Sequence, residues 1–171
     1  MRKKAAPFLL TIILVIFDQI TKFWVIRNIP VNQIYGKYWN DFLWIVHVRN
    51  TGIAFSMGQG VPDFVRRILF IILPLVIVLL LCYTLLSKKE FFHGAQRWYV
   101  AGIMGGGFGT LIDRIFRFDL GVVDFISIKV YGLFGLERWP TFNVSDSCVI
   151  IFVLLLAISV IFEKKEGKKD E

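Results

Sequence analysis

Residues 142–165 read FNVSDSCVIIFVLLLAISVIFEKK, an apolar run that begins beside a carboxylate, Asp146, and ends in lysines. Residues 147–162 carry no charged side chain, and a helix of 16 residues covers only about 24 Å at ~1.5 Å per residue. The hydrocarbon core of a bilayer is ~30 Å thick. A helix that crosses a membrane here must therefore carry Asp146 inside the edge of the core, which is costly unless the acid has a function or a partner.

The remainder of the chain is also strongly apolar. Of its 171 residues 56% are hydrophobic, and the mean hydropathy of +0.65 is too high for one soluble domain of this length. The net charge is +7, but the basic residues cluster in short runs beside apolar segments, which is typical of membrane orientation signals. Cys82 and Cys148 lie inside apolar runs and predict no disulfide framework. We therefore predict an integral membrane protein that binds no nucleic acid.

Four apolar stretches each approach the ~20 residues that a transmembrane helix needs. We predict a single, mainly α-helical membrane domain over residues 1–171 with two long loops on the outer side. The predicted spans are about 5–26, 68–87, 98–116 and 144–162, and the predicted outer loops are about 27–67 and 117–143.

Basic residues predict the orientation of these spans. Ten of the twenty Lys and Arg residues lie in the N-terminal segment, residues 88–97 and the C-terminal segment. They are Arg2, Lys3, Lys4, Lys88, Lys89, Arg97, Lys164, Lys165, Lys168 and Lys169. Because short cytoplasmic segments are enriched in Lys and Arg, both termini are predicted to be cytoplasmic and both long loops to lie outside.

Two other spans are also short of uncharged residues at their outer ends. The uncharged part of the first span is 13 residues long (5–17), and that of the third is 15 residues long (98–112). The charges at this level are Asp18, Lys22, Asp113, Arg114 and Asp146. Asp18 and Lys22 are four residues apart with the acid first, a spacing that favours an ion pair on one helix face. The set predicts a shared polar chamber near the outer surface; the alternative is that these charges only snorkel to the interface or cap helices.

The first outer loop contains DFLWIVHVRNTGIAFSMGQG (41–60), whose residues 42–49 alternate as in a β-strand. Its aromatic residues suit a small β-unit at the level of the lipid headgroups. Arg49 and Asn50 follow the predicted strand. A guanidinium and an amide together can hold an extended peptide or a carboxylate, so we count both as candidate binding residues.

The second outer loop contains GVVDFISIKV (121–130), which predicts a short strand with Asp124 on a largely apolar face. An acid on such a face is out of pattern and suggests a functional residue. The alternative is a surface acid on an edge strand. Asp146 also has a purely structural interpretation. Asn143 or Ser145 can cap the last helix, and an acid in the first turn is stabilised by the helix dipole.

Several chemistries are excluded by the residues present. The two histidines, His47 and His93, are predicted on opposite sides of the membrane, so no HExxH or paired-histidine zinc site is available. The chain contains no G-x-S-x-G elbow and no P-loop.

Three possibilities stay open at this point. Asp124 and Asp146 can share one proton and hydrolyse a peptide bond as an aspartic pair. A serine–lysine dyad is the competing chemistry, drawn from Ser56, Ser127 or Ser145 with Lys22 or Lys129 as the base. A lipid- or peptide-binding protein without catalysis, whose acids pair with Arg49 or Arg114, is the third.

Five motifs then carry a resemblance to a known family. They are FDQITK (17–22), RNTGIAFS (49–56), GTLIDR (109–114), VVDFI (122–126) and FNVSDS (142–147). In this order they resemble the sequence blocks of the lipoprotein signal peptidase family, also called signal peptidase II. The resemblance implies a four-span aspartic peptidase of the bacterial plasma membrane, with a small β-cradle and a short amphipathic helix outside, and with no metal or cofactor.

The same resemblance implies the reaction and the site. Such enzymes remove the signal peptide of prolipoproteins on the N-terminal side of a cysteine that carries diacylglycerol, near the outer face of the membrane. Asp124 and Asp146 match the catalytic pair. The supporting polar residues match Asp18, Lys22, Asn50, Asp113, Arg114 and Asn143. One position departs from the pattern, because the family usually has asparagine where this chain has Thr110. The expected partners are prolipoproteins and membrane lipid, and the expected state is a monomer.

Overall fold

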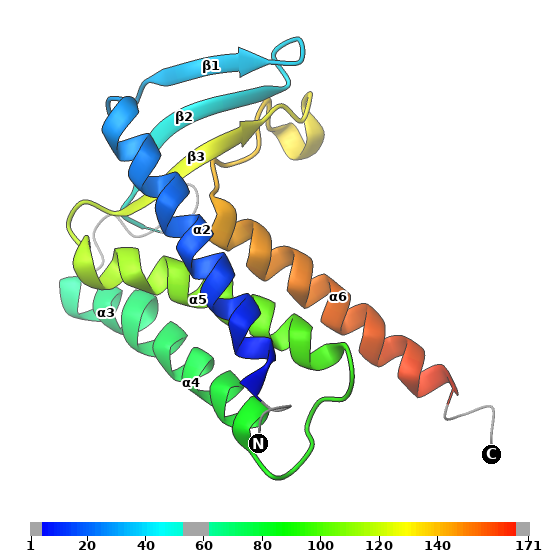
Figure 1. Ribbon diagram of the computed structural model, residues 1–171. Coiled ribbons are helices and arrows are strands. Elements are labelled where there is room, and N and C mark those ends of the chain that lie inside the picture. Colours follow the sequence, from blue (N-terminus) through cyan, green and yellow to red (C-terminus); the bar gives the residue numbers. More distant parts are fainter. Residues whose placement is uncertain (1–4, 53–61, 167–171) are drawn as a thin grey trace.

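The computed structural model describes residues 5–52 and 62–166. Its elements are the helices α2 (Pro7–Asn28), α3 (Asp63–Arg67), η2 (Ile68–Ile72), α4 (Leu73–Leu86), α5 (Gln96–Phe116), η3 (Leu133–Gly135) and α6 (Val144–Glu166), and the strands β1 (Ile34–Tyr38), β2 (Leu43–Asn50) and β3 (Val122–Ile128). The long helices form a bundle, and the sheet lies at the end of the bundle where α2 ends and α6 begins (Figure 1).

Each of the four predicted spans overlaps one helical segment, with ends that differ by a few residues. The second segment begins earlier than predicted, at Asp63, because α3, η2 and α4 run on without a break. Its middle part, η2, is π-helical, and the backbone N–H of Leu73 bonds to the carbonyl of Ile68. Pro74 follows directly and has no N–H to donate, so the wider turn lies where the normal helical bonding is interrupted.

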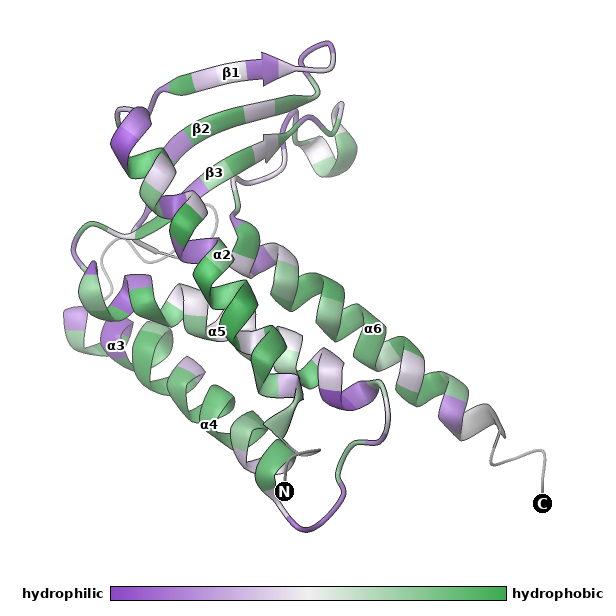
Figure 2. Ribbon diagram, in the orientation of Figure 1, coloured by the Kyte–Doolittle hydropathy of each residue, from purple (hydrophilic) through white to green (hydrophobic). Residues whose placement is uncertain are grey.

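Three described helical segments are long and apolar enough to cross a membrane. They are Pro7–Asn28, Asp63–Leu86 and Val144–Glu163. Figure 2 shows α4 and α6 as mostly hydrophobic along their lengths, whereas hydrophilic residues lie where the helices approach the sheet and in the segment that joins α4 to α5. The apolar surface therefore follows the bundle and ends near the sheet.

The remaining long helix, α5, packs against α2, α4 and α6, and about half of its residues are buried. Its small residues allow this close packing. A Cβ atom on Gly106 would meet the backbone of α6 at Ser145 and Val149, and one on Gly105 would lie 2.9 Å from Leu14 of α2. Glycine at these positions lets the helix backbones approach closely.

The sheet is antiparallel in the order β1-β2-β3. Val48 pairs with Asp124, and Asn50 pairs with Val122. Between Ile45 and Val48 the register shifts by a bulge in β2. On the free side of β3, the N–H groups of Phe125 and Ile126 donate to the carbonyl of Phe142. Because α6 begins two residues later, this pairing ties the first turn of α6 to β3.

Two apolar clusters hold the parts together. One lies between the bundle helices around Val100, Met104 and Leu85, and the other joins the outer end of α2 to β3 through Val25 and Phe125.

The predicted strands around residues 42–49 and 122–128 are present as β2 and β3. In the predicted second outer loop, the described residues include one short helical element, the 3-10 turn η3. Gly132 before it and Phe134 and Gly135 inside it have positive φ angles. The resemblance assigns the short amphipathic helix to no particular residues, so that helix stays a prediction.

Candidate active site

Asp124 and Asp146 come together where β3 meets the start of α6. Asn143, directly before α6, bonds to both. Its side-chain amide donates to Asp124 Oδ1 at 2.7 Å, and its side-chain carbonyl accepts the backbone N–H of Asp146 at 3.0 Å. In return, Asp146 Oδ2 accepts the backbone N–H of Asn143 at 3.0 Å.

This reciprocal pair of bonds is a capping box at the N-terminus of α6. The capping interpretation of Asn143 and Asp146 is therefore confirmed. It does not compete with a catalytic interpretation, because Asp146 Oδ1 takes no part in the box. The same amide that caps the helix also fixes the position of Asp124 relative to Asp146.

A second amide holds Asp124 from the side of β2. Asn50 Nδ2 donates to Asp124 Oδ2 at 3.0 Å, while Asn50 Oδ1 accepts the N–H of Gly52 at 3.2 Å. Asp124 is only 2% exposed, so the alternative of a surface acid on an edge strand is wrong. Phe142 lies beside β3 and covers the edge that would otherwise be open.

Burial and the neighbouring acid change the protonation of Asp124. Burial, and then the negative charge of Asp146, raise the pKa of Asp124 to about 7, although the bonds from Asn50 and Asn143 oppose the shift. Below about pH 7 such a pair retains one proton. One protonated carboxyl beside one carboxylate is the arrangement that acid–base hydrolysis of an amide needs.

Beneath the pair, a buried lysine joins two helices. Lys22 of α2 is fully buried, and its ammonium group lies 2.8 Å from Asp18 Oδ2 and 2.9 Å from Asp113 Oδ2. The other oxygen of Asp18 accepts the backbone N–H of Ser145 at 2.9 Å, in the first turn of α6. A lysine between two carboxylates links α2 to α5, and Asp18 links α2 to the helix that carries Asp146.

Asp113 extends this network toward β3. Its Oδ2 lies 3.5 Å from the backbone N–H of Val123, and its Oδ1 pairs with Arg117. Sequence reasoning missed Arg117. The sequence does contain a pattern that predicts this ion pair, because Asp113 and Arg117 have the same acid-first spacing of four residues as Asp18 and Lys22.

The two predicted arginines lie in different surroundings. Arg114 donates to the carbonyls of Asn50 at 3.2 Å and Gly52 at 3.0 Å, so it holds the end of β2 that carries Asn50. Arg49 pairs with Val123 in the sheet, one residue along from the pair Asn50 and Val122, so it lies on the face opposite Asn50. Its guanidinium is 3.5 Å from the carbonyl of Gly121 and contacts neither aspartate among the described residues.

These contacts bear on the alternatives left open by the sequence. Neither Asp124 nor Asp146 forms an ion pair with any residue that the structure describes, so pairing with Arg49 or Arg114 does not account for them. Ser56 lies outside the described residues.

The other candidate parts of a serine–lysine dyad are not bonded to one another. The hydroxyl of Ser145 is buried and has no hydrogen-bond partner among the described residues. Ser127 accepts a bond from Arg138, and Lys129 lies near Asp41 and Glu137. The ammonium group of Lys22 donates to two carboxylates, and an ammonium has no lone pair with which to accept a proton from a serine. The described residues thus offer an aspartic pair and no assembled serine–lysine pair.

Among residues 5–52 and 62–166, no group of three or more His, Cys, Asp and Glu side chains is close enough to hold a metal ion. Within residues 5–52 and 62–166, Thr110, the position that departs from the family pattern, forms no hydrogen bond to Asp124 or Asp146, and this part of the structure gives it no role.

Comparisons with known proteins agree with the geometry. A family model described as signal peptidase (SPase) II matches residues 10–162. The chain is 43% identical over 163 residues to the lipoprotein signal peptidase of Treponema denticola, covering 95% of this chain and 92% of that protein. It is 40% identical over 159 residues to the lipoprotein signal peptidase of Borreliella burgdorferi, covering 93% and 91%.

Two solved structures share the fold. A bacterial membrane enzyme solved by the in meso method at 2.3 Å resolution has a TM-score of 0.77 and 27% identity, covering 98% of this chain and 94% of that one. A second, solved by the same method at 1.9 Å resolution, has a TM-score of 0.72 and 26% identity, covering 91% and 92%.

Proposed function

The chain belongs to the signal peptidase II family of membrane proteases, and we propose that Asp124 and Asp146 are its catalytic pair. It removes the signal peptide from prolipoproteins. The observation that carries the assignment of the pair is the shared contact with Asn143, which holds two carboxyl groups together with no cation bonded to either among the described residues.

The proposed reaction follows from one proton shared by two carboxyl groups. The carboxylate takes a proton from a water molecule, whose oxygen bonds to the scissile carbonyl carbon, while the protonated carboxyl donates to the carbonyl oxygen. When the C–N bond breaks, a proton passes to the leaving amine. The amides of Asn50 and Asn143 orient Asp124, and the capping box orients Asp146.

The bond cut is proposed to be the one on the N-terminal side of the diacylglyceryl-modified cysteine. A signal peptide is itself a membrane helix, so this bond lies near the outer edge of the bilayer. Asp146 lies in the first turn of α6, at the end of the apolar surface next to the sheet. This depth supports the match between site and substrate, and it gives a reason for an acid at the end of an apolar helix.

We further propose that α5 also crosses the membrane, as the third of four spans in chain order. Its hydropathy is lowered by glycines and by its buried polar end, but neighbouring helices cover it on several sides. The distribution of basic residues supports a cytoplasmic position for both termini and residues 88–97, and a position of the sheet outside the plasma membrane of a bacterium.

The catalytic proposal is tested with a purified full-length enzyme in detergent and a diacylglyceryl-modified prolipoprotein, cleavage being followed as a gel shift. Asp124→Asn and Asp146→Asn are each expected to abolish cleavage. Asp119→Asn is the matched control, because Asp119 is an exposed acid in the same outer region. It should cleave as the wild type does, and cleavage that survives in both Asp124→Asn and Asp146→Asn contradicts the assignment.

The same assay tests the serine–lysine alternative. Ser127→Ala and Ser145→Ala are expected to retain cleavage, because the backbone N–H of Ser145, which bonds to Asp18, is unchanged by the substitution. An inactive Ser145→Ala together with an active Asp124→Asn would favour the serine mechanism.

Orientation is tested by placing single cysteines at exposed positions and treating intact cells with a membrane-impermeant maleimide. A cysteine at Asp119 should react, whereas one at Glu90 should react only after the cells are opened. The reverse pattern contradicts the proposed orientation.

A further inference from the structure

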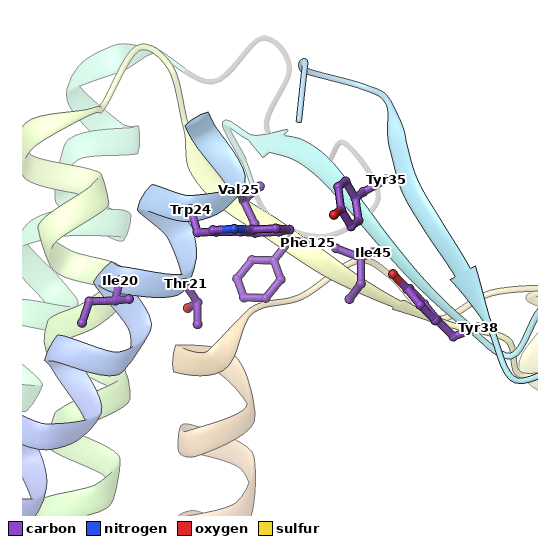
Figure 3. Close-up of a pocket in the computed structure, with 8 residues that line it drawn as sticks. All are labelled: Ile20, Thr21, Trp24, Val25, Tyr35, Tyr38, Ile45 and Phe125. Carbon is purple, nitrogen blue, oxygen red and sulfur yellow. The ribbon is translucent and has the colours of Figure 1, made fainter. Parts of the chain in front are cut away.

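A pocket of about 340 Å³ lies between the outer end of α2 and one face of the sheet (Figure 3). From α2, it is lined by Ile20, Thr21 and Trp24. From the sheet, it is lined by Tyr35, Tyr38 and Phe125. The hydroxyl of Thr21 is bonded within its own helix, to the carbonyls of Phe17 and Asp18, so the helix offers this pocket an apolar wall.

The pocket lies on the face of the sheet opposite the proposed catalytic pair. Phe125, which points into the pocket in Figure 3, follows Asp124 in β3. Successive side chains of a strand point to opposite faces. A peptide held against Asp124 therefore has the sheet between itself and this pocket.

The membrane side of α2 leads to the pocket. Ile20 is 60% exposed and Trp24 is 43% exposed, although both are large apolar side chains. Further along the same helix, Ile13, Ile16 and Phe17 are exposed as well. Because α2 is long and apolar enough to cross the membrane, these side chains face lipid, and the lipid-facing surface continues into the pocket.

A basic residue lies just beyond the pocket. Arg27 is three residues after Trp24 on α2, so the two are neighbours on the helix surface. Its guanidinium is exposed and lies 5.1 Å from the ring of Phe23. A guanidinium binds phosphate with paired, charge-assisted hydrogen bonds. A phospholipid carries a phosphate at the head of its acyl chains, whereas a diacylglyceryl-cysteine carries none.

We propose that this pocket binds one acyl chain of an outer-leaflet phospholipid, with the lipid phosphate at Arg27. The acyl chain moves from the apolar core of the bilayer into an apolar pocket, so the hydrophobic effect does not favour binding. Binding is favoured by packing of the acyl chain against the aromatic walls and by the contact between the phosphate and Arg27. An acyl chain in the pocket packs against Phe125 and so supports β3 next to Asp124. The choice of leaflet rests on the orientation proposed above, but lipid binding is measured without reference to cleavage.

The test places a photo-crosslinking amino acid, p-benzoylphenylalanine, at Tyr38 in the full-length enzyme. Tyr83 is the control position, because it is exposed on α4 but does not line the pocket. The protein is reconstituted in vesicles of phosphatidylethanolamine and phosphatidylglycerol, extracted into detergent, washed to remove loosely bound lipid, irradiated and weighed by mass spectrometry. Position 38 is expected to give roughly tenfold more phospholipid adduct than position 83. Equal labelling at the two positions overturns the proposal.

Three variants make the test more specific. Thr21→Trp fills the pocket and should remove the adduct, whereas Thr21→Val keeps the volume of the side chain and should retain it. Arg27→Gln should reduce the adduct severalfold by removing the phosphate contact. If Thr21→Trp does not fold, the comparison of positions 38 and 83 and the Arg27→Gln variant still decide the question. An adduct that forms only when a diacylglyceryl-modified peptide is added overturns the proposal in favour of a substrate chain.

Discussion

The side chain of Asn143 is bonded to both aspartates, donating to Asp124 Oδ1 at 2.7 Å and accepting the backbone N–H of Asp146 at 3.0 Å. One amide therefore connects the strand that carries the first acid to the helix that carries the second. The relative position of the two carboxyl groups depends on this residue more than on either strand or helix alone.

Asn143→Ser and Asn143→Ala separate the two roles of this side chain. Serine can still cap α6 but cannot reach Asp124. Asn143→Ser should therefore have the melting temperature of the wild type. It should lose roughly 100-fold in kcat/KM, a typical effect of a misplaced catalytic group. Asn143→Ala should lose similar activity and also about 1 kcal/mol of stability from the lost cap. The measurements are cleavage kinetics and thermal unfolding in detergent. Wild-type activity in Asn143→Ser would mean that the bond to Asp124 is not used.

The pH dependence of kcat/KM reports the proton shared by the aspartates. Because the pKa of Asp124 is raised to about 7, the proton is present below this pH and is lost above it. Activity should therefore fall as the pH rises through about 7. Asp119→Asn should show the same profile, since Asp119 is remote from the pair and exposed. An activity that stays constant from slightly acidic to clearly alkaline pH would contradict a shared proton.

Stability should depend on pH in the same direction. In the unfolded chain the pKa of Asp124 returns toward 3.8, so between 3.8 and about 7 the folded state binds more protons than the unfolded state. The free energy of unfolding then decreases as the pH rises through this range. Asp124→Asn cannot ionise and should flatten this slope. Melting temperatures in detergent across the range measure it, and an unchanged slope in the variant would mean that other groups cause it.

Lys22 is expected to hold the bundle together at the level of the site. Lys22→Met leaves Asp18 and Asp113 as buried carboxylates without their cation, which typically costs 3–5 kcal/mol. A second change, Asp113→Asn, should recover part of the lost stability in the double variant. Lys37→Met is the control, since Lys37 is exposed and has only weak contacts, a long pair with Asp41 and a cation–π contact with Trp44, and it should melt close to the wild type. A Lys22→Met enzyme of normal stability would contradict this role.

Gly106 and Gly107 provide a matched pair for helix packing. A Cβ on Gly106 would meet backbone atoms of α6 at Ser145 and Val149, whereas a Cβ on Gly107 would meet only the end of the Val78 side chain. Backbone cannot move aside without shifting the first turn of α6, which carries Asp146. Gly106→Ala should therefore lower both the melting temperature and the cleavage rate, and Gly107→Ala should affect both much less. Equal effects of the two substitutions would argue against a specific contact between α5 and α6.

Much of this molecule was predictable from the sequence because membranes impose length and charge rules. The apolar runs predicted the helical segments, strand alternation predicted β2 and β3, and the shortage of uncharged residues predicted that Asp18, Lys22, Asp113, Arg114 and Asp146 lie at one level. Lys22 does join Asp18 to Asp113. Arg49 shows the limit of such reasoning, because its neighbour Asn50 reaches Asp124 while Arg49 lies on the other face of β2.

The sequence by itself determined the class of protein, the residue types of the site and their approximate depth, because these follow from hydropathy and charge along the chain. Only the tertiary structure decided which polar groups meet. The bond from Asn143 to Asp124 joins residues 19 apart, and the bond from Ser145 to Asp18 joins residues 127 apart. Such contacts depend on the register of β2 with β3 and on the close packing of α5, where glycine lets α6 approach. No local pattern encodes these distances, and the function of the pair depends on them.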